Sequence, residues 1–218
     1  DQGALAPKPA SLTFEQAASL PLGAVTALQC LRAGGLASGQ RVLVIGASGG
    51  VGTFAVQIAK HARATVTGVC SSGNVELVRS LGAQHVIDYT TQAVSSTPGP
   101  YDLILQLGGT YSPLALRKLL GPRGTLIQSY GDGSSWLGPL VNIFKAAAIS
   151  RFVGQTLKSY TAAVTTEALE EITALIEAGD LVPVIGRSFP LAESADAIAL
   201  VEHGRPAGKV TVIVREDA

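Results

Sequence analysis

The stretch Ile45-Gly46-Ala47-Ser48-Gly49-Gly50-Val51-Gly52 decides how this chain folds. The apolar run before it predicts a buried strand over 41–45, and apolar residues at helical spacing after it predict a helix over 51–61. Glycine at position 49 lets backbone amides approach a ligand, because no Cβ stands in the way. Glycine at position 52 lets the helix pack closely against the strand. Strand, glycine-rich turn and helix in this order predict the first unit of a parallel α/β sheet.

The same alternation continues along the chain. Thr13 and Gln16 form a capping-box pattern, and two short helices with a break at Pro21 are predicted before the first strand. Further strands are predicted over 65–69, 85–87, 103–107 and 125–129, with helices over 75–81 and 113–120. This alternation predicts a doubly wound parallel sheet, the Rossmann fold. Beyond it we expect an apolar helix-like segment over 136–149, a sixth strand over 151–154, helices over 166–178 and 192–203, and strands over 187–189 and 209–214.

The glycine spacing is an A-x-G-x-x-G variant of the dinucleotide-binding fingerprint, with Ala47 at the position of the first glycine. A helix N-terminus offers free N–H groups and a partial positive charge, so a pyrophosphate is predicted to bind at four residues, Ser48, Gly49, Gly50 and Val51. The alternative interpretation is a tight strand–helix turn that binds no ligand. A P-loop is excluded, because no Gly-Lys-Ser/Thr follows the glycines.

The end of the second predicted strand indicates which dinucleotide binds. NAD-binding proteins usually place an acidic side chain there, about 20 residues after the glycines, to accept the ribose hydroxyls. The stretch 67–74 contains no Asp or Glu, while Ser71, Ser72 and Asn74 can hydrogen-bond a 2′-phosphate. The stretch 67–74 contains no Arg or Lys either, and the basic residue nearest to Asn74 in the sequence is Arg79. The sequence favours NADP(H) over NAD(H) as the cofactor.

The composition excludes several classes of function. Apolar residues make up 47% of the chain, which suits a sheet buried on both faces. Lys and Arg together number 16, as do Asp and Glu, so no net basic charge favours nucleic acid or an anionic membrane as a partner. The two cysteines, Cys30 and Cys70, indicate neither a disulfide framework nor a metal site. No signal-peptide pattern is visible, so we expect a cytoplasmic location.

Further motifs accompany the glycine-rich turn, in the segments 12–18, 22–27, 55–60, 81–89, 121–124 and 208–210. In this order and spacing they resemble the medium-chain dehydrogenase/reductase (MDR) superfamily, in its zinc-independent branch similar to quinone oxidoreductases and zinc-type alcohol dehydrogenases. The resemblance implies an NAD(P)-binding Rossmann domain with leading helices over 1–184. It also implies that 185–218 is the return segment of a GroES-like catalytic domain, whose N-terminal half this chain lacks. We expect the helix over 192–203 to pack on the Rossmann core.

The resemblance also assigns site residues position by position. Tyr89 matches a tyrosine that lies beside the adenosine phosphate, and Asn74 stands where the family has a phosphate-binding lysine. Thr26 matches a residue near the nicotinamide end, and Gln106 stands where an aspartate is common. The loop that begins at Tyr130 is expected to line the cofactor cleft. The turn below the nicotinamide ribose matches Leu107, Gly108 and Gly109.

We predict no metal in this chain. Zinc-dependent relatives carry a ligating cysteine at the position that Pro21 occupies here, and the four-cysteine structural lobe of those relatives is missing from this sequence. The histidines His61, His85 and His203 are scattered without the spacing of zinc ligands.

The leading functional hypothesis is the cofactor-binding part of an NADP(H)-dependent oxidoreductase similar to quinone or enone reductases and alcohol dehydrogenases. The whole enzyme would transfer hydride between nicotinamide and a carbonyl or activated alkene of a small-molecule substrate. No catalytic proton donor is identified, so this part is expected to be inactive alone. Two further hypotheses stay open, a dinucleotide sensor or structural module without turnover and a methyltransferase-type Rossmann domain. The apolar segment 136–149 allows a homodimer.

Overall fold

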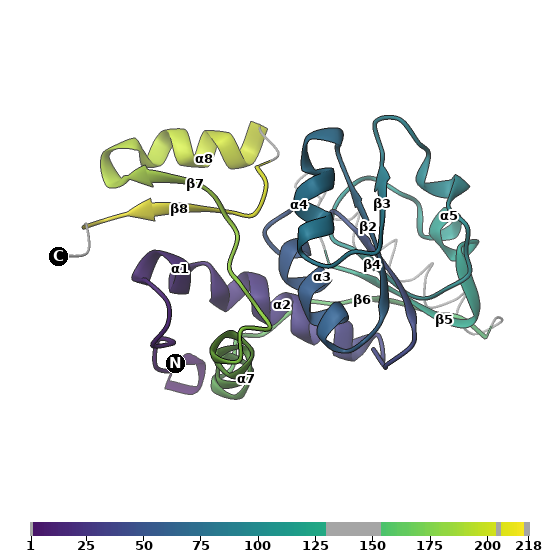
Figure 1. Ribbon diagram of the computed structural model, residues 1–218, viewed down its shortest axis with the longest axis horizontal. Helices are drawn as coiled ribbons and strands as arrows, with labels where there is room; N and C mark the ends of the chain where they lie inside the picture. Colours follow the sequence, from purple (N-terminus) through teal and green to yellow (C-terminus); the bar gives the residue numbers. More distant parts are fainter. Residues whose placement is uncertain (1, 130–153, 204–205, 216–218) are drawn as a thin grey trace.

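The computed structural model describes residues 2–129, 154–203 and 206–215 (Figure 1). Its main sheet contains the strands β1 Arg41–Ile45, β2 Thr65–Cys70, β3 His85–Asp88, β4 Tyr101–Gln106, β5 Leu120–Gln128 and β6 Thr156–Ser159. All neighbouring strands are parallel, and their spatial order is β3-β2-β1-β4-β5-β6. The chain changes direction across the sheet between β1 and β4, as in a doubly wound fold. The predicted fold class is confirmed.

Helices and a second, smaller sheet complete the structure. The α-helices are α1 Phe14–Ala18, α2 Leu20–Ala33, α3 Gly52–His61, α4 Val75–Ser80, α5 Pro113–Arg117, α7 Thr166–Glu177 and α8 Ser194–His203. Short 3-10 helices are η1 Gln2–Ala4, η2 Ser72–Asn74, η3 Val94–Ser96 and η4 Leu191–Glu193. The second sheet pairs β7 Ile185–Pro190 in parallel with β8 Lys209–Ile213.

Residues 42–45 of strand β1 are all apolar, and the structure shows why. Val42 and Val44 pack on one face of the sheet with residues of α2, α3 and α7. Leu43 and Ile45 pack on the other face with Leu116 of α5. Each of the four β1 side chains is at most 2% exposed, and burying such a side chain stabilises the fold by about 1.5–3 kcal/mol. Both faces of β1 are therefore core.

The predicted helix start at Thr13 is confirmed. The Thr13 hydroxyl accepts a hydrogen bond from the Gln16 N–H, and the Gln16 side-chain oxygen accepts one from the Thr13 N–H at 3.0 Å. The predicted break at Pro21 is displaced, because α1 and α2 are separated at Ser19 and Pro21 lies in the first turn of α2. Proline is tolerated there, since the first helical N–H groups have no intrahelical partner.

Two predicted elements differ from the structure. The helix predicted over 113–120 is shorter, because Leu120 already pairs with Tyr101 and begins β5. The structure has a sixth strand at β6, which pairs with the last residues of β5; of the range predicted for it, 151–153 lie outside the described residues and Gly154 is in a bend before β6. The predicted segment 136–149 and the site residue Tyr130 lie outside the described residues.

The helix α8 packs on β7 and β8, as Figure 1 shows at the end of the molecule where the C-terminus lies. This corrects the prediction that residues 192–203 pack on the Rossmann core. Ala197 of α8 and Phe189 of β7 are buried in this region. The small parallel sheet needs cover on a face, and α8 provides it.

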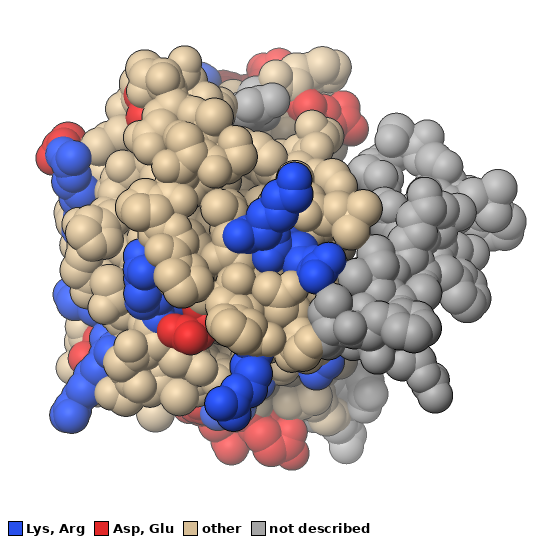
Figure 2. Space-filling view, turned by 90° about the vertical axis from the view of Figure 1, so that its right-hand side faces the viewer, with Lys and Arg blue, Asp and Glu red and all other residues tan. Residues whose placement is uncertain are grey.

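Charged side chains do not gather into one large patch on the face that Figure 2 shows. On the face that Figure 2 shows, Lys and Arg lie in small groups among neutral residues. This agrees with the balance of 16 basic and 16 acidic residues in the sequence. Among the residues that the structure describes, none of the helices combines the length and the apolar character needed to cross a membrane.

At Gly52 the backbone of α3 lies so close to the glycine-rich turn that we expect a larger side chain there to destabilise the fold. A Cβ at Gly52 would lie 2.0 Å from the Gly46 carbonyl oxygen and 2.8 Å from the Ala47 carbonyl carbon, both of which are backbone atoms. We expect Gly52→Ala to lower the free energy of unfolding by about 1–3 kcal/mol, as overpacking does. Urea denaturation measures this. Gly73→Ala is the matched control, because a Cβ at Gly73 meets no atom within 4 Å. Equal stability of the two variants would contradict the prediction.

Candidate functional site

The predicted site residues of β1 to β4 gather at one edge of the sheet, because the strands are parallel. The ends of the strands are in register: Ile45 pairs with both Val69 and Gln106, and Cys70 pairs with Asp88. Ligands of such sheets bind outside the carboxyl ends of the strands, where the order of strands reverses. Here that point lies between β1 and β4.

The glycine-rich turn leaves backbone donors available at this edge. Gly46 has a φ of 85°, a left-handed conformation, and its carbonyl accepts the Gly49 N–H at 3.1 Å. Among the described residues, no backbone acceptor pairs with the N–H of Val51 or Gly52, at the start of the ten-residue helix α3. A Cβ at Gly49 would meet only the Gly46 oxygen, at 3.4 Å. Helix-start amides that have no backbone acceptor are the usual donors of an anion site, which fits a pyrophosphate.

The first residues of β8 lie across this turn. The Gly208 N–H donates to the Ser48 carbonyl at 2.7 Å, and Gly208 forms a parallel bridge with Gly49. The Lys209 side chain covers Gly50: a Cβ there would lie 2.7 Å from its Cδ and 3.5 Å from its Nζ. Burial lowers the pKa of the Lys209 amine from its ordinary value. An anion on the turn would therefore meet a partly buried ammonium.

Sequence reasoning missed Lys209 as a site residue. The motif Gly208-Lys209-Val210 is visible in the sequence, but nothing in its local pattern indicates that β8 returns to the turn. The available signal was a lysine directly after a glycine at the start of a strand.

The ends of β2 and β3 bring an acidic side chain to the predicted adenosine region. The Ser72 hydroxyl donates to Asp88 Oδ2 at 2.6 Å, and both the N–H and the hydroxyl of Thr90 donate to Asp88 Oδ1. These hydrogen bonds lower the pKa of Asp88, and the bond from Ser72 has the largest effect. The Ser72 hydroxyl also contacts the Thr90 hydroxyl at 2.7 Å, so Ser72, Thr90 and Asp88 form one hydrogen-bonded group. The acid absent from 67–74 comes from the neighbouring strand, which local sequence reasoning did not foresee.

Other predicted adenosine-side residues lie close by. The Asn74 amide donates to the Ser71 hydroxyl oxygen at 3.1 Å, so these two residues are in contact. The Tyr89 N–H donates to the Cys70 carbonyl at 3.0 Å. Burial, and then the neighbouring Tyr89, raise the pKa of Tyr111. Tyr111 lies in the loop after β4 and packs on the core face that contains Leu116, and sequence reasoning did not single it out.

The predicted turn after β4 lies directly against the glycine-rich turn. The Leu107 N–H donates to the Ile45 carbonyl at 3.0 Å, and a Cβ at Gly46 would lie 3.4 Å from the Gly108 nitrogen. Among the described residues, no atom lies within 4 Å of a Cβ built at Gly108, so none of them covers the other side of this turn. Gly109 has a φ of 72°. Leu107 and Gly108 therefore lie against the glycine-rich turn, and the place of Leu107, Gly108 and Gly109 below the nicotinamide ribose stays a prediction.

Helix α2 also packs on the glycine-rich turn. A Cβ at Gly23 would lie 2.6 Å from the Gly50 carbonyl oxygen, so the helix packs directly on the glycine-rich turn. Thr26, one turn further along α2, is 7% exposed. Its predicted place near the nicotinamide end is compatible with this packing and stays a prediction.

The described residues do not fit a metal site. Within that part of the chain, no group of three or more His, Cys, Asp or Glu side chains could hold a metal ion. Both cysteines are buried. Burial, and then the charge of Asp88, raise the pKa of Cys70 to about 11, so its thiol is protonated at neutral pH. The absence of zinc from the protein stays a prediction.

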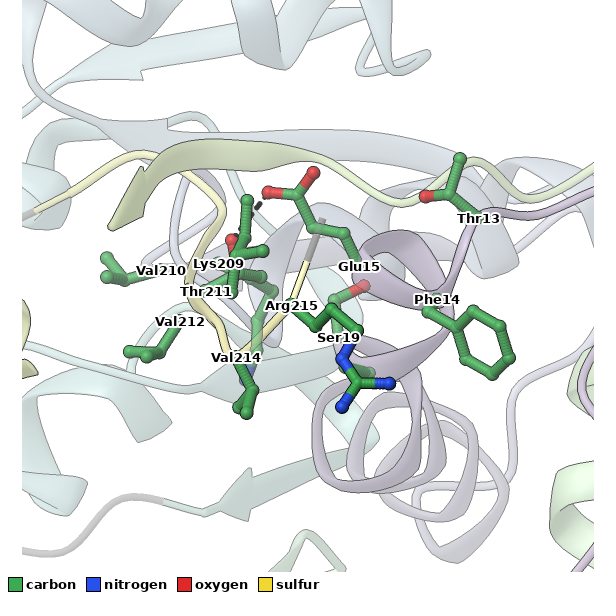
Figure 3. Close-up of a pocket in the computed structure, with 12 residues that line it drawn as sticks. Thr13, Phe14, Glu15, Ser19, Lys209, Val210, Thr211, Val212, Val214 and Arg215 are labelled. Atoms are coloured by element: carbon green, nitrogen blue, oxygen red, sulfur yellow. Dashed lines mark hydrogen bonds between the residues drawn. The ribbon is translucent and has the colours of Figure 1, made fainter. Parts of the chain in front are cut away.

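A groove between α1 and β8 lies beside the turn (Figure 3). In it, Glu15 accepts hydrogen bonds from Ser188 and from Thr211, the latter at 2.7 Å. These bonds lower the pKa of Glu15. The rim is apolar, because Phe14 is 68% and Val214 75% exposed. Lys209 lines this groove and also covers Gly50, so the groove adjoins the glycine-rich turn.

Comparisons with known proteins agree with this geometry. The family described as zinc-binding dehydrogenase matches residues 81–212. The bovine (Bos taurus) mitochondrial NAD(P)H oxidoreductase RTN4IP1 is 39% identical over 95% of this chain and 57% of its own length. The chloroplastic NADPH-dependent alkenal/one oxidoreductase of Arabidopsis thaliana is 30% identical over 95% of this chain and 49% of its own length.

The fold is similar to that of solved structures. The quinone oxidoreductase from Coxiella burnetii superposes with a TM-score of 0.84, at 28% identity, over 95% of this chain and 63% of that structure. This chain spans about half to two thirds of the length of these proteins. The family match covers more than half of the chain, and the parallel sheet has the order that the family fold requires. The chain belongs to the zinc-binding dehydrogenase family of the medium-chain dehydrogenase/reductase superfamily.

Proposed function

We propose that this chain binds NADP(H) at the carboxyl edge of its six-stranded sheet. In the whole protein it would act as an oxidoreductase that transfers hydride between nicotinamide and a carbonyl or an activated alkene. The observation that carries the proposal is the anion site of the glycine-rich turn. It combines the N–H groups of Val51 and Gly52, which no backbone acceptor uses, with the covering side chain of Lys209.

Each part of the site has a role in this proposal. The amides of Val51 and Gly52 and the Lys209 ammonium hold the pyrophosphate, since both donors favour negative charge. The open side of the turn at 107–109, with Thr26, receives the nicotinamide half. Tyr89 and the Ser71–Asn74 pair receive the adenosine half. The bound cofactor supplies hydride chemistry, while the protein positions it and excludes water.

The comparisons support the choice of reaction class. The names of two relatives include NAD(P)H or NADPH as reductant, and the superposed structure is a quinone oxidoreductase. Among the described residues we assign no proton donor. The substrate is proposed only as a small molecule with a reducible carbonyl or conjugated alkene. Cytoplasmic location and homodimer formation stay predictions.

A division of the chain is part of the proposal. Residues 1–184 form the cofactor-binding domain, and 185–218 belong to a further domain that other residues of the whole protein would complete. The support is the isolated pair β7–β8, since parallel sheets are normally covered on both faces. Exposed apolar side chains on and around this pair, Phe14, Leu191, Ile198, Val201, Val212 and Val214, are consistent with a missing cover.

Direct binding tests the proposal. Fluorescence titration of the 218-residue chain with NADPH, NADH and S-adenosylmethionine should show saturable binding of a nicotinamide dinucleotide. Binding of S-adenosylmethionine alone would instead support a methyltransferase-type domain, and binding of none of the three would overturn the proposed site.

Lys209→Met should weaken dinucleotide binding. The substitution keeps the length of the side chain but removes the cation, and loss of a charge-assisted contact lowers affinity by about tenfold. Lys118→Met is the matched control, because Lys118 is exposed and precedes β5 at the opposite edge of the sheet. Equal affinities of the two variants would contradict the assignment of Lys209.

The affinity should also depend on pH through Lys209. Its lowered pKa means that the ammonium loses its proton at a lower pH than an exposed lysine does. Only the ammonium attracts the pyrophosphate, so affinity should fall as the pH rises through this lowered pKa. Titrations from neutral to alkaline pH should show this fall in the unsubstituted protein and a smaller one in Lys209→Met. Parallel curves would show that another group titrates.

Asp88 should set how strongly the site prefers NADP(H). Its carboxylate lies beside Ser72, where a 2′-phosphate is proposed to bind, and repels that phosphate. Because the group is solvent-accessible, the repulsion is weak, and Asp88→Asn should raise the ratio of NADPH to NADH affinity by about two- to fivefold. Glu76→Gln, an exposed acid nearby that pairs with Arg79, is the control. An unchanged ratio in Asp88→Asn would show that the carboxylate does not reach the phosphate.

A further inference from the structure

Two buried glutamines meet at the carboxyl ends of β4 and β5. Gln106 is 0% and Gln128 is 8% exposed, and they are register partners in the parallel ladder. The Gln128 Nε2 donates to Gln106 Oε1 at 2.8 Å. The Gln106 Nε2 in turn donates to the carbonyls of Gly109 at 3.1 Å and Tyr111 at 3.2 Å. A line of hydrogen bonds therefore runs from β5 through β4 into the loop 107–111.

The partners of Gln106 fix which way its amide faces. If the amide were flipped, its oxygen would face the two carbonyl oxygens, and its NH2 would face the NH2 of Gln128. Both contacts would be repulsive, and buried polar atoms would lose their partners. A carboxylate in place of the Gln106 amide could not donate to the carbonyls of Gly109 and Tyr111, so both would lose this hydrogen bond. A neutral amide of this length supplies the two donors and one acceptor that the surroundings require.

The loop held by Gln106 is the one that borders the cofactor cleft. On one side it packs against the glycine-rich turn, because a Cβ at Gly46 would lie 3.4 Å from the Gly108 nitrogen. On the other side, no described residue lies within 4 Å of a Cβ built at Gly108. Gly109, whose carbonyl Gln106 binds, has a left-handed backbone with a φ of 72°. The amide bonds therefore act on the backbone that forms the rim.

We propose that Gln106, oriented by Gln128, is a positioning residue that sets the loop 107–111 for the nicotinamide half of the dinucleotide. Gln106 lies beneath the rim and reaches the ligand only through the backbone that it holds. The inference rests on the proposed function and deepens it, because it separates what recognises the nicotinamide half from what recognises the adenosine half.

The test compares a whole dinucleotide with its adenosine half. In Gln106→Met the side chain keeps its length but loses both donors. We expect the affinity for NADPH to fall about tenfold, while that for adenosine 2′,5′-bisphosphate changes by less than about twofold. The same comparison is made with NADH and its adenosine half, AMP. Both lack the 2′-phosphate, so this second ratio does not depend on how that phosphate binds. Gln128→Met should shift the same ratio in the same direction by a smaller factor, which keeps the test valid if Gln106→Met does not fold.

Gln57→Met is the matched control. Gln57 is also a buried glutamine, and its Nε2 donates to the Thr53 and Val182 carbonyls, each at 3.0 Å. It lies within α3, so its loss should lower thermal stability without changing the ratio of the two affinities. A merely structural role for Gln106 predicts this same result for Gln106→Met.

The possible outcomes separate the two proposals. A ratio that changes in Gln106→Met and not in Gln57→Met supports the inference. Equal losses for NADPH and the bisphosphate, or no loss for either, would overturn the inference and leave the proposed function intact. An unsubstituted protein that binds neither the dinucleotides nor their halves would overturn both.

Discussion

The structure depends on the close approach of helix α3 to the end of strand β1. The start of the helix lies so near the turn that a single methyl group at Gly52 would overlap the Gly46 carbonyl. This approach directs the first N–H groups of α3 toward the carboxyl edge of the sheet. Helix α2 packs on the same turn through Gly23, and β8 crosses it through Gly208. The elements that surround the site are thus arranged around one backbone contact.

The fold could be predicted wherever short-range patterns determine it. The run 42–45 is apolar because both of its faces are core, and the glycine spacing after it reflects the close approach of α3. The pattern was weaker at β6, where Leu157 is the one fully buried side chain of four residues. The end of α5 was misplaced because Leu120 takes part in strand pairing with Tyr101, a contact that local periodicity does not contain.

The candidate site was predictable only in its sequence-local part. The glycine-rich turn, Ser71 and Asn74 are read from neighbouring residues. Asp88 and Lys209 enter the site through strand register and through a long return of the chain, so their roles required the three-dimensional structure. The two residues also give the edge opposite charges at different places: a partly buried cation at the turn and a carboxylate at the end of β3. A ligand with several phosphates meets a graded electrostatic field along this edge.

The crossing of β8 over the glycine-rich turn links two distant parts of the chain. During synthesis, β1 and α3 emerge early, whereas Gly208 and Lys209 follow only after the strands of the main sheet and the helices α7 and α8. The amides at the start of α3 are therefore synthesised before the lysine that covers the glycine-rich turn. A chain that ends within α7 would contain every strand of the main sheet but would lack Lys209, the cation of the proposed phosphate site.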